Sequence, residues 1–151
     1  IAARAAIMSQ AGQYNLLRCI KRQDSVAATL ALARFAESTI SIVHLLEGRY
    51  TPFYKWGFHS LQQLELGCEI SRHLSRIPEL EHSLYEGDFV KAHNQAFAIT
   101  ESICKETVKE LHRQGLSAVS SAFLQDHLAE IMDGITDSRL RSLPPMLDCQ
   151  N

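Results

Sequence analysis

Aromatic and basic side chains are concentrated in one short segment of this sequence, residues 49–59, which we call the elbow. It holds five of the chain's eleven aromatic residues and three basic ones: Tyr50, Phe53, Tyr54, Trp56 and Phe58, with Arg49, Lys55 and His59. Aromatic rings bury large areas, and tyrosine and tryptophan also carry polar tips. Beside cations, such rings can form the wall of a small-molecule or nucleotide site. The elbow is therefore the first candidate for a binding site.

A structural role for the same rings stays open. Phe53, Trp56 and Tyr50 could plug the end of a helical bundle, since large apolar rings are common in protein cores. Such a plug does not need Lys55 or Arg49, so the two cations favour the binding interpretation. The two interpretations differ in whether the rings are buried.

A polar stripe leads toward the elbow along the preceding predicted helix. Arg34, Glu37, Ser41 and His44 are spaced three, four and three residues apart, so they share one helix face. One interpretation is a pocket lining that continues the elbow. The other is a solvated face on which Arg34 and Glu37 form an exposed pair of small energetic value.

Motifs for catalysis or metal binding are missing. No Gly-Ser is followed by an Asp-x-Asp pair, the arrangement that holds two metal ions for nucleotidyl transfer, so we expect no catalytic residue and no enzyme activity in this chain alone. No histidine belongs to a metal-ligand pair, and His93, His112 and His127 are expected on helix surfaces. The sequence predicts no metal site.

Arg76 and His82 resemble the arginine-histidine motif of the helical RNases that associate with minimal nucleotidyltransferases. Pro78 lies between them and predicts a turn rather than a helix start that aims both side chains inward. This turn argues against an RNase.

Size and composition set the broad class. With 151 residues, 46% of them apolar, the chain has the size of one domain that can bury a core without a metal. No apolar run approaches the ~20 residues of a membrane span, so we expect a soluble protein without a membrane partner. A net charge of -2 argues against nucleic acid as a partner. The scattered Cys19, Cys68, Cys104 and Cys149 are expected to be free thiols of a reducing compartment, so we expect a cytoplasmic protein.

Apolar periodicity predicts an all-α fold, one helical bundle of about five to seven helices over residues 1–151. The expected helices span residues 2–22, 25–46, 53–64, 68–74, 78–85 and 119–133, one long helix near 88–115, and a short last helix. The expected N-caps are Asp24, Asp88 and Asp137. On helix 25–46 the expected core stripe is Val26, Leu30, Ala33, Ala36, Ile40 and Val43, broadened by Leu32, Phe35, Ile42 and Leu46.

Several segments together resemble a known family. They are "GQYN" from Gly12, "RCIKRQD" from Arg18, "ALARFAESTISIVHLLEGRY" from Ala31 and "YTPFYKW" from Tyr50. These segments are similar to the bacterial family of unknown function numbered four thousand and thirty-seven, in which a helical part follows a nucleotidyltransferase-like catalytic domain. The resemblance is strongest over residues 9–64, and the tail "GITDSRLRSL" is similar to the family's closing segment. Glu47 stands where that family usually has asparagine.

The resemblance implies a helical accessory domain packed on a small α/β catalytic domain. In the aminoglycoside nucleotidyltransferases such helices help to build the acceptor pocket. By this match the candidate substrate contacts are Tyr50, Tyr54, Lys55 and Trp56, with Arg18 and Lys21 as phosphate neighbours. The elbow and the stripe add Arg49, Arg34 and His44 to the candidate substrate-binding residues.

We therefore expect a non-catalytic substrate-binding domain of a nucleotidyltransferase-like protein. Because the chain opens at Ile1, directly in helical sequence, we expect an N-terminal catalytic domain to have been removed. This chain would hold no cofactor, whereas the intact protein would use Mg²⁺ and a nucleoside triphosphate on a small-molecule or nucleotide substrate. The alternatives are a stand-alone helical interaction module, including a homodimer, and a helical RNase of the toxin type.

Overall fold

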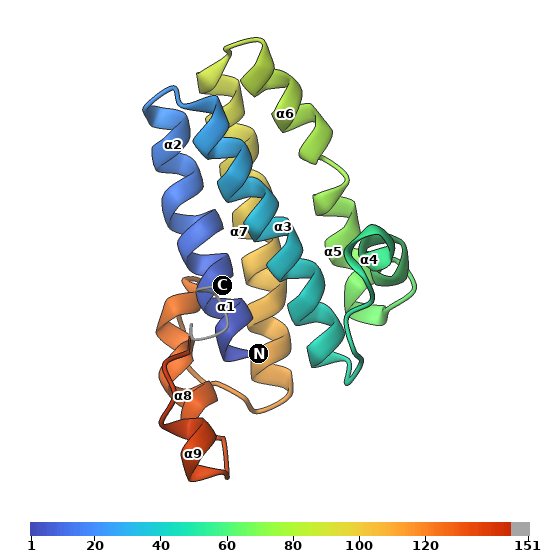
Figure 1. Cartoon of the computed structure of the whole chain (residues 1–151), viewed down its shortest axis with the longest axis vertical. Coiled ribbons are helices and arrows are strands. Elements are labelled where there is room, and N and C mark those ends of the chain that lie inside the picture. The colour runs from blue at the N-terminus through green and yellow to red at the C-terminus, as the bar shows by residue number, and fades with distance from the viewer. Residues whose placement is uncertain (146–151) are drawn as a thin grey trace.

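The computed structural model describes residues 1–145, and within them no β-strand occurs. The predicted all-α helical bundle is confirmed. Its elements are α1 (Ala2–Met8), η1 (Ser9–Leu16), α2 (Leu17–Lys21), α3 (Ser25–Leu46), α4 (Tyr54–Leu61), α5 (Glu65–Leu74), α6 (Ile77–Tyr85), α7 (Phe89–Arg113), η2 (Leu124–His127), α8 (Leu128–Asp133) and α9 (Ser138–Arg141). Figure 1 shows the rod of α1, η1 and α2 lying beside α3, with α7 behind them.

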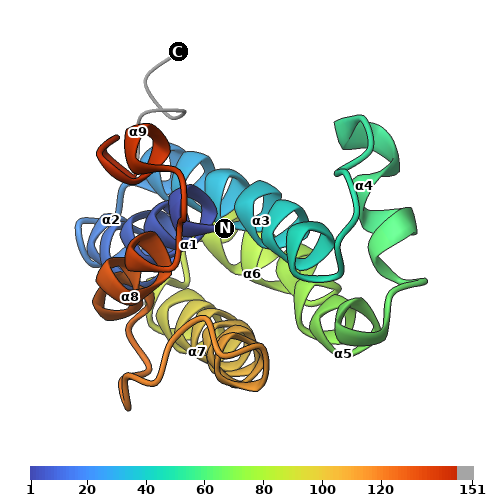
Figure 2. The same cartoon turned by 90° about the horizontal axis from the view of Figure 1, so that it is seen from below.

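Helix α4 lies at the edge of the molecule. It follows the end of α3 and contacts α3 and α5, while α5 and α6 run along α7. In Figure 2 α4 stands out from the bundle, on the side away from α2 and α8. The elbow is therefore exposed on a projecting corner that is attached to the lower half of α3.

The first predicted helix is confirmed as a continuous rod, but its middle part, Ser9–Leu16, is a π-helix. Gly12 lies in this part, and a Cβ atom placed on it would be 2.3 Å from Cδ2 of Phe35. The close approach of the rod to α3 therefore depends on a residue without a side chain. π-Helical turns are rare and mostly mark local irregularities inside α-helices.

Helix α3 is the central helix, and it is buried on a different face from the one expected. Asp24 caps it as predicted, since its Oδ1 accepts from the backbone N–H of Ala27 at 2.9 Å. The expected core stripe was wrong in its first half, because Val26 is 71% exposed and Leu30 64% exposed. The residues expected only to broaden the stripe, Leu32, Phe35, Ile42 and Leu46, are the buried ones. Apolar residues lie on nearly every side of α3, so periodicity could not identify its inner face.

By length and composition α3 could cross a membrane, and it is the one helix in residues 1–145 that passes this test. The expectation that no apolar run approaches this length was therefore wrong. In the structure 44% of the apolar stretch is buried inside the bundle. The core helix of a soluble bundle passes the same test, so the feature is weak evidence for a membrane span.

The long predicted helix is confirmed as α7. Asp88 caps its first turn, with Oδ1 accepting from the backbone N–H of Lys91 at 3.0 Å, and the chain leaves the helix at Gly115 with φ of 67°. Cys104 is fully buried on this helix, whereas Cys68 is exposed on α5. Burial, with a smaller effect of the nearby Glu101 carboxylate, raises the pKa of the Cys104 thiol. Cys19, Cys68 and Cys104 are free thiols, and Cys149 lies outside the described residues.

The helix expected at 119–133 begins only at Leu124. Serine hydroxyls bond to nearby backbone groups in the preceding loop, which favours turns over helix. The Ser117 hydroxyl accepts from the N–H of Val119 at 3.3 Å, and the Ser121 hydroxyl accepts from the N–H of Phe123 at 3.1 Å. Asp137 caps α9 as predicted, accepting from Arg139 and Leu140.

Candidate functional site

Two side-chain hydrogen bonds attach the elbow and the rest of α4 to α3. The Nδ1–H of His44 donates to the carbonyl of Ile40 at 2.7 Å, and its Nε2 lies 2.9 Å from the hydroxyl of Ser60 on α4. The Thr51 hydroxyl donates to the Ser41 hydroxyl at 3.2 Å. Both contacts come from the polar stripe predicted on α3. That stripe therefore supports the elbow rather than facing solvent throughout.

The aromatic rings of the elbow are exposed. Tyr50 is 97% exposed, Phe53 65%, Tyr54 76% and Trp56 58%. The alternative in which Tyr50, Phe53 and Trp56 plug the bundle end is therefore wrong. The rings of Phe53 and Tyr54 lie 4.6 Å apart between centroids, and the Nζ of Lys55 lies 5.6 Å from the ring centroid of Trp56. Exposed aromatic clusters of this kind mark binding surfaces more often than isolated exposed residues do.

A cavity of about 710 Å³ opens beside the elbow, between α1, α3 and α4. This volume is within the range of small-molecule sites. The polar residues that line it are Arg4, Glu37, Ser41, Tyr50, Thr51 and Tyr54. The apolar lining comes from Ile1, Ala3, Ile40, Leu45, Pro52 and Gly57. Gly57 allows α4 to approach α3 closely, because a Cβ on it would lie 3.1 Å from Cγ2 of Ile40.

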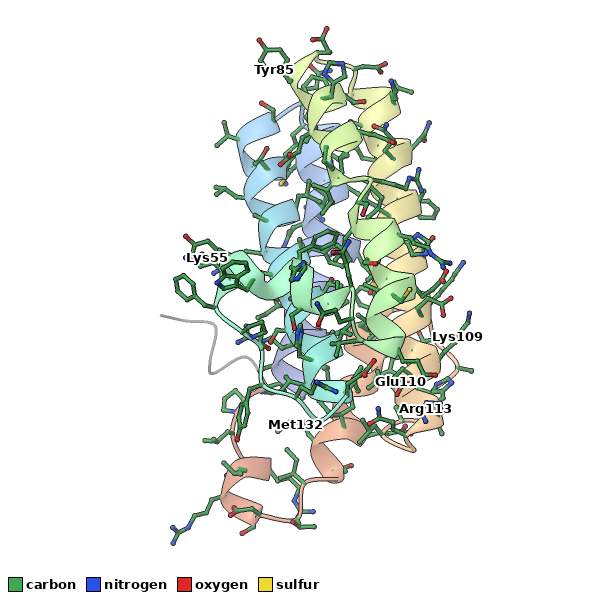
Figure 3. All side chains as sticks on the ribbon, turned by 90° about the vertical axis from the view of Figure 1, so that its right-hand side faces the viewer. Lys55, Tyr85, Lys109, Glu110, Arg113 and Met132 are labelled. Atoms are coloured by element: carbon green, nitrogen blue, oxygen red, sulfur yellow. The ribbon has the colours of Figure 1, made fainter. Side chains whose placement is uncertain are left out.

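The structure brings together only some of the predicted substrate-binding residues. Tyr50 and Tyr54 line the cavity, beside Glu37 and Ser41 of the stripe. Five predicted residues do not line it: Arg34 and Arg49 are exposed, His44 is buried, and Lys55 and Trp56 are exposed on α4. Figure 3 shows Lys55 on the projecting corner, pointing away from the bundle. Substrate binding by these residues stays a prediction.

Two lining residues were missed by the sequence analysis, Arg4 and Thr51. Thr51 could have been noticed, because it lies inside the elbow between Tyr50 and Pro52. Arg4 is a lone cation in the first helical turn, and only the packing of α1 against α3 places it at the cavity. Arg18 and Lys21, predicted as phosphate neighbours, lie on α2 at the other end of the first rod and do not line the cavity.

A cluster of polar and charged side chains at the C-terminal end of α7 connects this helix to the end of α3, just before the elbow. Arg113 donates to both carboxylate oxygens of Glu110 at 2.7 and 2.6 Å, and the two residues lie side by side in Figure 3. The bond from Arg113 is the main cause that lowers the pKa of Glu110. Gln114 joins this pair to α3 by donating to the carbonyl of Leu46 at 2.7 Å. Glu47 accepts from the backbone N–H of Leu66 at 2.7 Å, so it caps α5.

His127 was expected on a helix surface, and this was wrong because the side chain is fully buried. Its Nδ1 lies 2.9 Å from the Ser117 hydroxyl, and its Nε2–H donates to the carbonyl of Ser121 at 2.9 Å. Glu130 accepts from the N–H of Ala118 at 2.6 Å and from the Ser117 hydroxyl at 2.8 Å, and the bond from Ala118 is the main cause that lowers its pKa. No hydrogen bond joins Glu130 to the imidazole, and both groups bond to Ser117 instead. A catalytic triad needs the carboxylate on the histidine, so this group is better explained as holding the loop 116–123 in place.

The RNase interpretation gains no support from the geometry around Pro78. A turn is present at Ser75 and Arg76, but α6 begins directly after it at Ile77. Pro78 lies in the first turn of α6, where proline fits a helix, so the expectation that this is not a helix start was wrong. His82 is exposed and Arg76 is half-buried, and no hydrogen bond joins the two. Residues 1–145 also contain no group of three or more His, Cys, Asp or Glu side chains placed to hold a metal ion.

Comparison with protein families gives a match in the first part of the chain. Residues 1–57 match the family described as Domain of unknown function (DUF4037). The predicted resemblance is thereby confirmed for this segment. The DUF4037 segment contains α1, η1, α2, α3 and the elbow as far as Gly57. Neither a curated protein nor a solved structure matches the chain.

The DUF4037 segment coincides with the cavity. Every residue that lines the cavity, from Ile1 to Gly57, lies within the matched residues. The helices outside the segment, α5 to α9, contribute no lining residue. The shared part of the chain is therefore the part that builds the candidate site.

Proposed function

We propose that this chain is a non-catalytic helical domain that binds the substrate of a nucleotidyltransferase-like protein in the bacterial cytoplasm. In this proposal a separate catalytic domain supplies the transfer chemistry, with Mg²⁺ and a nucleoside triphosphate. The helical domain supplies the wall of the substrate cleft. The observation that carries the proposal is the coincidence of the DUF4037 segment with the cavity beside the exposed elbow.

The composition of the cavity supports substrate binding. It combines an apolar floor with a few convergent hydroxyl and charged groups, the usual make-up of a small-molecule site. Tyr50 and Tyr54 present their rings to solvent, where a substrate could stack on them. The Thr51 to Ser41 bond and the His44 to Ser60 bond fix the backbone of the elbow and of α4 relative to α3, which lowers the cost of ordering this segment when a ligand binds.

The test is nucleotidyl transfer by the full protein that contains this chain. Tyr54→Ala is expected to lower kcat/KM by about two- to tenfold, since a stacked ring contributes about 0.5–1.5 kcal/mol. Tyr85→Ala is the matched control, because Tyr85 is an 86% exposed tyrosine at the far end of the bundle (Figure 3). Lys55→Ala shows whether the outer side of the elbow also contributes. Equal kinetics in Tyr54→Ala, Tyr50→Ala and the wild type would reject the proposal.

A second candidate is a helical interaction module that forms a homodimer. The observation in its favour is the exposed apolar face of α3, where Val26 and Leu30 are mostly solvent-accessible. This candidate predicts a stable dimer of these residues alone, which light scattering would detect. A monomer over the whole accessible concentration range would reject it.

A further inference from the structure

Two opposite charges line the cavity beside the elbow without contacting each other. Arg4 extends from α1 and Glu37 from α3, and no ion pair within 4.0 Å joins them or joins either of them to another side chain in residues 1–145. Around them lie hydroxyl groups, tyrosine rings and apolar side chains, and no other lining residue has a charged side chain. A ligand that fills the space between would meet a cation on one side and a carboxylate on the other.

We infer that the cavity binds a small zwitterion, with its ammonium group at Glu37, its anionic group at Arg4 and an apolar or aromatic body against Tyr50 and Tyr54. Guanidinium and carboxylate groups form strong charge-assisted hydrogen bonds with such partners. The zwitterion would neutralise both side chains at once, whereas an ion of single charge leaves one of them without a partner. This inference rests on the proposed function, because it assigns the cavity to the acceptor substrate.

The same lining disfavours a polyphosphate in this cavity. Arg4 is the single cationic side chain among the lining residues, and Glu37 would repel the several negative charges of a nucleoside triphosphate. The Thr51 hydroxyl donates its proton to Ser41, so of these two hydroxyl groups only Ser41 could donate a hydrogen bond to a phosphate. The charge balance therefore points to the acceptor rather than the nucleotide as the occupant.

Binding of simple zwitterions to the full chain tests this inference. The probes are glycine, 4-aminobutanoate and 6-aminohexanoate, which separate the two charges by increasing lengths, with butylamine and butanoate as analogues of single charge. Isothermal titration is expected to find one chain length that binds at least about tenfold more tightly than both analogues, the contribution of one charge-assisted hydrogen bond. If no zwitterion binds better than the analogues of single charge, the inference fails.

Variants of the two charges identify the site. Glu37→Gln should reduce the affinity of the preferred zwitterion to that of butanoate, and Arg4→Gln should reduce it to that of butylamine. Arg141→Gln is the matched control, because Arg141 is an exposed arginine on α9 that does not line the cavity. In Glu37→Lys the preference should pass to a dicarboxylate of the same length. Zwitterion binding that survives both glutamine variants would overturn the assignment.

The inference and the proposed function can fail separately. If Tyr54→Ala lowers transfer activity but no zwitterion binds, the ligand class is rejected and the substrate-binding role stands. If a zwitterion binds through Arg4 and Glu37 but Tyr54→Ala leaves transfer activity unchanged, the binding site is supported and the transferase role is rejected.

Discussion

Gly12 and Phe35 meet at a point where the first rod and α3 are in closest contact. Phe35 is fully buried, and its ring occupies the space that a Cβ on residue 12 would need. In the sequence Gly12 looked like a weak point of a helix, since glycine is a poor helix former. The structure gives it a packing role, which no local pattern could have shown.

Gly12→Ala is expected to destabilise the chain by about 1–3 kcal/mol, because the added methyl group must displace a buried ring. Urea denaturation measures this change. Gly134→Ala is the control, since a Cβ there would meet backbone oxygen atoms no closer than 3.5 Å. In a Phe35→Leu background the cost of Gly12→Ala should shrink, and an unchanged cost would show that the π-helix rather than the ring is responsible.

Glu110 and Glu130 are expected to make the fold less stable at acid pH. Their folded-state pKa values are lowered from 4.5, by Arg113 and by the N–H of Ala118 respectively. A carboxyl whose folded pKa is lowered stabilises the fold above its unfolded pKa, and this contribution is lost as pH falls through the folded value. The free energy of unfolding should therefore decrease as pH falls below about 4.5.

Variants should weaken this pH dependence. Glu110→Gln and Glu130→Gln each remove one titrating group, so each should flatten the acid side of a plot of unfolding free energy against pH. Glu81→Gln changes an exposed glutamate of α6 without a hydrogen bond, and it should leave the slope unchanged. A slope that both Glu110→Gln and Glu130→Gln leave intact would contradict this explanation.

At the scale of elements, Glu47 connects the end of α3 to the start of α5. Its carboxylate accepts the second N–H of α5, which has no intrahelical partner. The sequence left the role of this position in doubt, since the resembling family usually has asparagine there. A capping role agrees with both residue types, because each offers a side-chain oxygen.

Glu47→Ala is expected to cost about 1 kcal/mol of stability, the usual value of a lost helix cap. Glu47→Gln keeps an acceptor oxygen and should cost less. Thermal and urea denaturation give both values, with Glu81→Ala as a matched surface control. Equal stability of Glu47→Ala and the control would show that water replaces the bond.

Element boundaries were predictable where they depend on local chemistry. The three aspartate caps, Asp24, Asp88 and Asp137, were all predicted, because a cap needs only residues within one turn. The start of the helix before Asp133 was missed, because serine bonds in the preceding loop depend on Glu130 and His127 across the loop. The inner face of α3 was missed because the packing of α1 and η1 against α3 determines which of its faces is buried.

At the scale of the whole molecule, the two neighbouring leucines Leu30 and Leu32 test which way α3 faces. Leu30 is 64% exposed and Leu32 is 1% exposed. In the bundle, Leu32→Ala should therefore cost about 2–5 kcal/mol and Leu30→Ala no more than about 0.5 kcal/mol. Urea denaturation of the two variants measures the difference. Similar costs for both would mean that α3 is covered on both sides, by a membrane or by a partner.

The fold class followed from the sequence, whereas the cavity did not. Helical periodicity and caps are local, so they predicted the bundle and the long α7. The cavity needs α1, α3 and the elbow together, and only Tyr50 and Tyr54 of the predicted substrate-binding residues line it. The elbow was found because its composition is unusual, and its exposure could be decided only once α4 was placed.

The reactivity of Cys104 can report how often the bundle opens. Its buried thiol is protonated and out of reach, while the thiol of Cys68 is at the surface. An alkylating reagent should modify Cys68 rapidly, whereas it should modify Cys104 only when the bundle opens transiently. The slow phase of modification would then count opening events directly, and a ligand in the cavity should lengthen it without touching the cysteine.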